Sequence, residues 1–317
     1  MTLRAWPIAG IGEIAPGDDL ATIIVEHLDE PLVDGDVVVV TSKVVSKAAG
    51  LATRGDREAL LDAATDRIVA RRGQTRIVRT HSGLTLAAGG IDASNIEPGS
   101  VVPLPEDPDQ SARDLRNALI ELAGVQLGVI ITDTVGRAWR IGQTDIAIGA
   151  AGVAPVLSFE GVLDSYGNLL AVTAPAVADE IAGVADLVAG KLDGYPVVLV
   201  RGLPAEWLSD AAEGASTLIR EERDDMFGLG ARDAVLVAAG YDDDIRGFPS
   251  PEPDDDLLAM ARQGVDLTLA DAELVDGSIE VRPLNASPAA FIEAGVLAER
   301  LRILARALGQ DVPIRVV

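Results

Sequence analysis

Two short runs of β-branched residues constrain the fold of this chain more than any other feature. Residues 37–40 (VVVV) and 129–131 (VII) contain no polar residue. Each run is too short for a buried helix and is rich in side chains that favour strands. We therefore predict buried strands within a mixed α/β fold that has more than one sheet.

Helical spacing of apolar residues separates these runs from further predicted strands. Helices are predicted near residues 20–28, 56–72, 111–122, 176–189, 257–262 and 289–308, with shorter helical segments near 213–222. Further strands are predicted at residues 76–79, 84–87, 146–148, 196–201 and 278–282.

The chain of 317 residues is long enough for two or three modules. An acidic, proline-bearing stretch begins at Tyr241 and predicts a boundary there. We therefore predict a body at residues 1–240 and a small α+β extension at residues 241–317. The extension shows helix and strand patterns but no catalytic group of residues.

The composition excludes several classes of protein. A net charge of −24, from 50 acidic and 26 basic residues, repels nucleic acid and anionic membranes, so we expect neither as a partner. Cysteine is absent and only two histidines occur, which excludes disulfides, thiolate metal sites and multi-histidine zinc sites. With no long apolar segment for a membrane span or signal peptide, these features favour a cytoplasmic protein.

Polar side chains follow both buried runs. Thr132, Asp133 and Thr134 come after the second run, and Arg137 lies just beyond them. Hard oxygen ligands beside an arginine suit a divalent cation and phosphates, although a β-turn with a solvated charged tip explains the same residues.

Two other segments carry polar side chains that could either bind a ligand or have an ordinary structural role. Lys43 and Lys47 follow the first buried run four residues apart, so one helical turn would bring their charges together on phosphate oxygens. Ordinary surface lysines at a strand end are the alternative. Asp92 and Asn95, after a glycine pair, supply oxygens and an amide, and an Asx-turn is the simpler explanation.

Six segments, in this order, resemble the coenzyme F420-0:L-glutamate ligases, also called F420 γ-glutamyl ligases. They are residues 10–14 with 16–19, 41–47 (TSKVVSK), 87–95 (AAGGIDASN), 131–137 (ITDTVGR), 164–167 and 177–181. The similarity covers residues 7–228 and is greatest to the actinobacterial version. The tail after Tyr241 is too short for the flavin-binding reductase domain which that version often carries, so we expect neither reductase activity nor flavin binding.

The resemblance implies a metal- and GTP-dependent ligase. GTP would phosphorylate the terminal carboxylate of coenzyme F420-0, and the amine of L-glutamate would then displace phosphate, leaving GDP and phosphate as by-products. Later rounds would extend a γ-linked polyglutamate tail. The resemblance also implies two divalent ions, Mg²⁺ or Mn²⁺, with K⁺ as a further candidate ion, and an intertwined homodimer. Such phosphoryl transfer needs chiefly positioning and charge neutralisation.

The resemblance assigns roles residue by residue. Asp92 and Asp133 would be metal ligands, Thr134 would bind a second metal, and Asp92, Asp133 and Arg137 form the catalytic set. The GTP site would be lined by Ile11, Gly12, Glu13, Ile14, Ser42, Lys43, Lys47, Asn95 and Lys191, the last within a loop at residues 189–195. No GxxxxGK[ST] motif occurs, so a P-loop does not hold the nucleotide.

Lys191 departs from the family pattern. Some members have an acidic residue at this position, where it binds the second metal, and a charged lysine cannot do so. Either another acid such as Asp193 replaces it, or the second metal is held more weakly.

Three other functions remain open from the sequence. A metal-dependent phosphatase or nucleotidase would use the same aspartates on water. A nucleotide-binding regulatory protein would have lost catalysis. The tail could instead be the functional part, as an interaction module.

Overall fold

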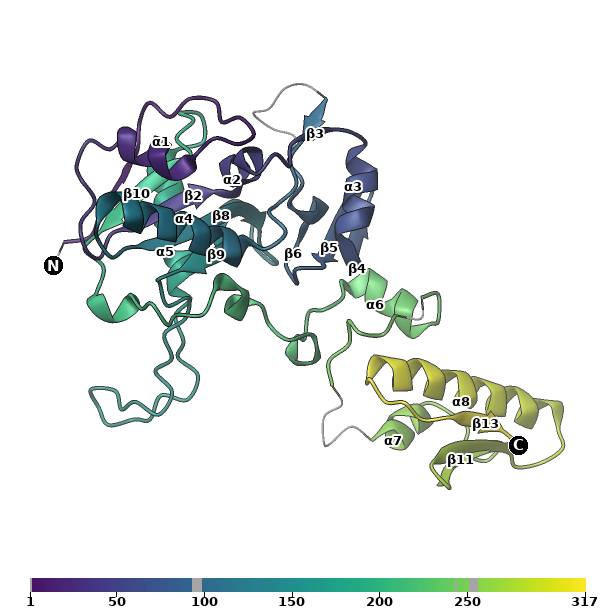
Figure 1. Ribbon diagram of the computed structural model, residues 1–317. Coiled ribbons are helices and arrows are strands. Elements are labelled where there is room, and N and C mark those ends of the chain that lie inside the picture. Colours follow the sequence, from purple (N-terminus) through teal and green to yellow (C-terminus); the bar gives the residue numbers. More distant parts are fainter. Residues whose placement is uncertain (1, 93–98, 243, 251–255) are drawn as a thin grey trace. The chain divides into compact units, whose positions relative to one another are not determined.

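The computed structural model describes residues 2–92, 99–242, 244–250 and 256–317. Contacts within it divide the chain into two compact units, Met1–Arg67 with Ile77–Ile219 and Ile68–Arg76 with Arg220–Val317. The fold is mixed α/β with several sheets, which confirms the predicted class (Figure 1). Residues 220–240 belong to the second compact unit, while the assignment of the ligase body to residues 1–240 stays a prediction.

A five-stranded mixed sheet of order β1-β10-β2-β8-β9 forms the centre of the first unit. The strands are β1 (Arg4–Pro7), β10 (Val197–Arg201), β2 (Val37–Thr41), β8 (Gly128–Gly136) and β9 (Gln143–Ala151). Strands β2 and β8 run parallel with Thr41 opposite Thr132, and the other neighbours are antiparallel. The parallel pair therefore brings the polar residues after β2 and those in β8 to one edge of the sheet.

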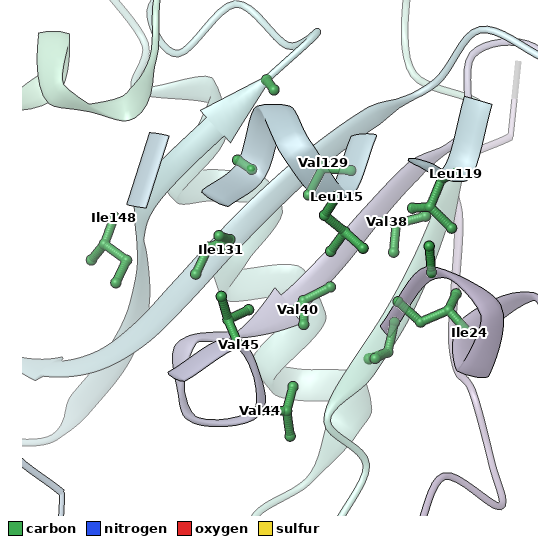
Figure 2. Close-up of a cluster of buried hydrophobic side chains, with 14 of the residues drawn as sticks. Ile24, Val38, Val40, Val44, Val45, Leu115, Leu119, Val129, Ile131 and Ile148 are labelled. Carbon is green, nitrogen blue, oxygen red and sulfur yellow. The ribbon is translucent and has the colours of Figure 1, made fainter. Parts of the chain in front are cut away.

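Apolar side chains on both faces of this sheet form two cores, because successive strand residues point to opposite faces. On one face Val38, Val40 and Ile131 pack with helices α1 (Leu20–Glu26) and α4 (Pro108–Ala123) (Figure 2). On the other face Val39 and Ile130 pack with helix α5 (Val177–Ala189). Coverage of both faces explains why the two β-branched runs lack polar residues.

Helix α2 (Ser42–Ala48) starts immediately after β2, so Lys43 and Lys47 lie one helical turn apart. The remaining elements of this region are β3 (Thr53–Arg54), α3 (Arg57–Ala64), β4 (Thr65–Arg72), β5 (Thr75–Thr80), β6 (Thr85–Ala87), the 3₁₀ turn η1 (Ala88–Gly90) and β7 (Ser100–Val101). Antiparallel pairs join β3 to β7 and β5 to β6.

The helix predicted at residues 56–72 is wrong in its second half. Helix α3 ends at Ala64, and strand β4 begins at Thr65. Within β4 the buried positions are Arg67 and Val69, two residues apart, which is the strand period rather than the helical one. Ile68 and Val69 fit both the helical and the strand period, so the apolar pattern alone did not distinguish a helix from a strand here.

Between β9 and α5 the chain forms a narrow two-stranded ribbon at residues 157–175, here called the arm. The backbone N–H of Phe159 donates to Thr173 at 2.9 Å, and that of Gly161 donates to Leu170 at 2.9 Å. Figure 1 shows the arm as a long teal loop that extends away from β9. Its apolar side chains are exposed, with Tyr166 91% and Val172 92% accessible.

The second unit contains a sheet of order β11-β12-β13 packed against one long helix. Its elements are the 3₁₀ turn η4 (Glu222–Asp224), α6 (Ala231–Ala238), α7 (Leu257–Arg262), β11 (Ala270–Val275), β12 (Ser278–Pro283), α8 (Pro288–Ala307) and β13 (Ile314–Val316). Helices α7 and α8 and strand β12 were predicted, whereas α6, β11 and β13 were not. Near residues 205–224 the helical segments are only the 3₁₀ turns η2 (Ala205–Trp207), η3 (Ala215–Leu218) and η4.

No helix in the described part of the chain combines the length and the apolar character needed to cross a bilayer.

Candidate active site

The candidate site lies where β8 extends beyond β2. The last residue of β8 that pairs with β2 is Thr132, whereas β8 continues to Gly136 along β9. Asp133 and Thr134 therefore lie within a strand that continues beyond the residue predicted to end it, Asp133. Because they have no β2 partner on that side, this part of the strand can face ligand.

Two cavities of about 450 Å³ and 420 Å³ meet at this end of β8. Thr41, Lys43, Thr134 and Lys191 line both cavities, and we call these four residues the junction. Each cavity has the volume typical of a small-molecule site. The junction carries two ammonium groups and two hydroxyls, which suits the transfer of a negatively charged group from one cavity to the other.

The first cavity collects most of the residues predicted to bind nucleotide. Gly12, Glu13, Ile14, Lys43, Lys47 and Lys191 all line it, together with most of the loop after α5. The ammonium group of Lys47 lies 2.6 Å from the Glu13 carboxylate. Ile11 lines neither cavity and instead packs against the core.

The second cavity contains the predicted metal ligands Asp92 and Asp133, with Ser42. Lys43 Nζ lies 2.6 Å from Asp92 Oδ2. The backbone of Asp92 exchanges hydrogen bonds of 3.0 and 2.9 Å with the backbone of Val102. These bonds fix the position of the Asp92 Cα, from which the carboxylate side chain extends. Gly90, just before it, has φ +69° and lies so close to Leu104 and Leu86 that a Cβ would overlap them, so this turn requires glycine.

Asp133 has an unusual ionisation. Burial is the main cause that raises its pKa to about 7. The negative charges of Asp145 and Asp92 contribute to this rise, and the Thr134 backbone N–H and Lys191 oppose it. The two predicted metal ligands are therefore close enough to repel each other, on one side of the sheet edge. This convergence is what the cation hypothesis required.

These residues fit a divalent cation shared with a substrate better than one held by the protein alone. Among the described residues, no group of three or more His, Cys, Asp or Glu side chains is arranged to hold a metal ion. Magnesium is commonly held by one or two carboxylates together with substrate phosphates. Asp92 and Asp133 supply such a partial set for one cation, and the mutual repulsion of their carboxylates favours a cation between them.

The sequence prediction assigned no role to Asp145. It lines the first cavity and accepts hydrogen bonds from the hydroxyls of Thr132 and Thr134. Its signal in the sequence was an acidic residue directly before the apolar part of a strand. Asp193, the acid considered in place of Lys191, is not among the residues lining either cavity.

Two acids of α5 lie close to the backbone of β9. Asp179 accepts a 2.9 Å hydrogen bond from the Ala147 backbone N–H. The Asp186 carboxyl lies near the Asp145 backbone N–H and also lines the first cavity. Burial raises the pKa of both carboxyl groups.

Besides Ile11, the predicted residue Arg137 does not line either cavity, and Asn95 lies outside the described residues. Arg137 is exposed in the turn between β8 and β9, where its guanidinium donates to the Ile141 carbonyl at 3.3 Å. The catalytic role of Arg137 and the nucleotide contact of Asn95 stay predictions.

Comparison with known proteins gives one consistent result. A family model described as F420-0:Gamma-glutamyl ligase matches residues 10–57 and 54–202. A protein named coenzyme F420:L-glutamate ligase from Methanopyrus kandleri is 40% identical over 252 residues, covering 71% of this chain and 98% of the relative. Proteins of the same name from Methanothermobacter thermautotrophicus and Archaeoglobus fulgidus are 37% and 39% identical, over 69% and 71% of this chain and 96% of each relative.

Proposed function

The chain belongs to the F420-0:gamma-glutamyl ligase family, and we propose that it joins L-glutamate to coenzyme F420-0 at the expense of GTP. Family membership confirms the resemblance found in the sequence and makes the chain a ligase. The observation that best supports the GTP-dependent route is the junction, where Lys43 and Lys191 line both cavities beside Asp92 and Asp133.

In this proposal the nucleotide occupies the first cavity and the acid substrate reaches the junction from the second. A carboxylate oxygen of the coenzyme bonds to the γ-phosphorus while the bond from that phosphorus to the β–γ bridging oxygen breaks, and GDP leaves. Lys43 and Lys191 offset the negative charge that both substrates bring to the junction. An acidic protein with net charge −24 needs such local cations to bind two anions.

The second step makes the amide. The nitrogen of L-glutamate attacks the carbonyl carbon of the acyl phosphate, phosphate leaves with the C–O bonding pair, and the amine loses a proton. Later rounds repeat this on the γ-carboxylate of the added glutamate. Divalent cations, Mg²⁺ or Mn²⁺, would neutralise the transferred phosphoryl group when bound, with Asp92 and Asp133 as ligands of one and Thr134 of the second, and K⁺ as a further candidate ion.

Product analysis tests the proposal directly. The full chain is incubated with coenzyme F420-0, L-glutamate, GTP and Mn²⁺, and the coenzyme is examined by mass spectrometry. We expect a gain of at least one glutamyl residue and one GDP released for each residue added. GDP release that is unaffected by omitting glutamate would indicate the phosphatase or nucleotidase alternative, and nucleotide binding without turnover would indicate a regulatory protein.

We also propose that the chain is a homodimer in which the arm contacts the second copy. Leu163, Leu169 and Val172 on the arm are 61%, 67% and 92% accessible, an extent of apolar exposure that favours a protein partner. A ribbon that protrudes from its own unit is suited to reach across to another molecule.

Replacing Leu163, Leu169 and Val172 together by serine is expected to convert the dimer to a monomer, since an interface of this kind depends on its buried apolar centre. Sedimentation equilibrium measures the change, and circular dichroism should stay unchanged because these side chains are exposed. The control is Leu122→Ser, an exposed leucine on α4 that is 51% accessible. A wild-type monomer, or a serine variant that stays dimeric, would contradict this interface.

A further inference from the structure

A shift in the pairing of β8 with β9 places Asp145 beside Thr134. Ile131 pairs with Gly149, but the next residue, Thr132, pairs with Ala147, so β9 contains one extra residue at this point. Beyond the shift Thr134 pairs with Asp145. Without it Thr134 would pair with Ile146, and Asp145 would point to the opposite face of the sheet.

The Asp145 carboxylate accepts one hydroxyl on each oxygen. Thr134 Oγ1 donates to Oδ1 at 2.6 Å, and Thr132 Oγ1 donates to Oδ2 at 2.9 Å. A threonine hydroxyl has a single proton and two lone pairs. With its proton directed to Asp145, the oxygen of Thr134 has lone pairs left for another group, and Thr134 lines both cavities.

We propose that Asp145 is the positioning residue for Thr134: it holds the Thr134 hydroxyl proton so that the oxygen presents its lone pairs to a divalent cation at the junction. The inference rests on the proposed role of Thr134 as a cation ligand. Groups that orient a ligand in this way affect metal affinity nearly as strongly as the ligands themselves.

The chemistry of an amide makes Asp145→Asn a stringent variant. An ionised carboxylate only accepts hydrogen bonds, whereas an asparagine amide has one accepting oxygen and a donating NH₂ group. In the variant one of the two threonines faces a donor, which competes with a cation for the oxygen lone pairs. The change preserves the size of the side chain, so packing of β9 is affected little.

The test measures Mn²⁺ binding to the full chain in the presence of GDP, by the loss of the electron paramagnetic resonance signal of free Mn²⁺, after subtraction of the Mn²⁺ that GDP alone takes up. We expect Asp145→Asn to weaken Mn²⁺ binding about 10- to 100-fold. Thr134→Val should weaken it to a similar extent, and Thr134→Ser, which keeps the hydroxyl, should retain it. The matched control is Asp179→Asn, because Asp179 binds the backbone of the same strand at Ala147 and touches neither threonine hydroxyl in the described contacts.

A double-mutant cycle then separates positioning from a general effect on charge. If Asp145 acts through Thr134, Asp145→Asn should weaken binding much less in the Thr134→Val background than in the wild type. Equal losses in both backgrounds, or Mn²⁺ affinity within twofold of wild type in Asp145→Asn, would overturn the proposal. In turnover, the variant should need more Mn²⁺ for half-maximal rate and approach the wild-type kcat at saturating Mn²⁺.

Failure of this inference differs from failure of the ligase function. A wild-type chain that binds Mn²⁺ but adds no glutamate to coenzyme F420-0 would contradict the ligase function alone. A chain that adds glutamate normally and whose Asp145→Asn variant binds Mn²⁺ normally would contradict the positioning role alone.

Discussion

Asp133→Asn is expected to abolish ligation and at the same time to make the chain harder to unfold above pH 7. Loss of activity follows from removing a carboxylate that lies among Asp92, Asp145 and the junction. Removing a group that stabilises transferred charge costs on the order of 10³-fold in kcat. The rate of glutamate addition with GTP and saturating Mn²⁺ measures this loss.

The gain in stability follows from the raised pKa of Asp133, about 7 against a usual value of 3.8. Between these two pH values the folded chain keeps a proton on Asp133 that the unfolded chain has released. The free energy of unfolding therefore falls as pH rises through this interval, and the stabilising contribution of the protonated form is lost above pH 7. Asparagine is neutral at every pH, so the variant avoids a penalty on the order of a few kcal/mol.

Urea unfolding at pH 5 and pH 8, without divalent cations, measures this effect. Asp133→Asn should be more stable than wild type by a larger margin at pH 8 than at pH 5, because wild type loses stability progressively from about pH 3.8 to pH 7. Added Mn²⁺ should stabilise wild type more than the variant, because a ligand that binds only the folded form raises its stability. The control is Asp114→Asn, an exposed residue on α4 that should change neither activity nor stability. Turnover of Asp133→Asn within tenfold of wild type would contradict the catalytic role of Asp133. A variant less stable than wild type at pH 8 would contradict its raised pKa.

Asp109→Ala is expected to cause the largest loss of stability in the first unit, about 3–5 kcal/mol. The buried Asp109 carboxylate, in the first turn of α4, accepts backbone N–H groups from Ala150 at 2.9 Å, Ala215 at 2.7 Å and Ser216 at 3.1 Å. It thus ties α4, β9 and η3 together. Gly214 lies so close that a Cβ there would overlap this carboxyl group, so larger residues at position 214 should also be destabilising.

Alanine would leave the N–H groups of Ala150, Ala215 and Ser216 without their acceptor, and buried donors without acceptors are costly. Urea unfolding measures the loss. Asp109→Asn should cost less, because its remaining oxygen can still accept from Ala150 and Ala215, which both bind Oδ1. The control is Asp107→Ala, which removes only the exposed N-cap of the same helix and should cost about 1 kcal/mol. Equal losses in Asp107→Ala and Asp109→Ala would contradict the account.

The parts of the site that could be predicted are those fixed by local pattern. The β-branched runs predicted β2 and β8. The four-residue spacing of Lys43 and Lys47 was noted as one helical turn, and both lie in α2. The family resemblance assigned Asp92 and Asp133 to one metal site, and both residues line one cavity.

The parts that could not be predicted depend on pairing between distant segments. The extension of β8 through Thr132, Asp133 and Thr134 exists because β9 pairs with it, and the shift that brings Asp145 to Thr134 has no local signal. Strand β4 was assigned to a helix because its apolar residues fit either period. In the second unit β11 carries Asp271 and Glu273, which obscured a strand whose alternate residues are buried.

The carboxylates of α5 have a consequence for how this molecule can associate. Strand β9 ends the sheet, and an unprotected last strand is a template for strands of other molecules. Here the outward N–H group of Ala147 is already bound by Asp179, and the Asp186 carboxyl lies near that of Asp145. A foreign strand would meet negative charge and a helix instead of free donors at these two positions. Fibril growth by strand addition is therefore disfavoured at this edge.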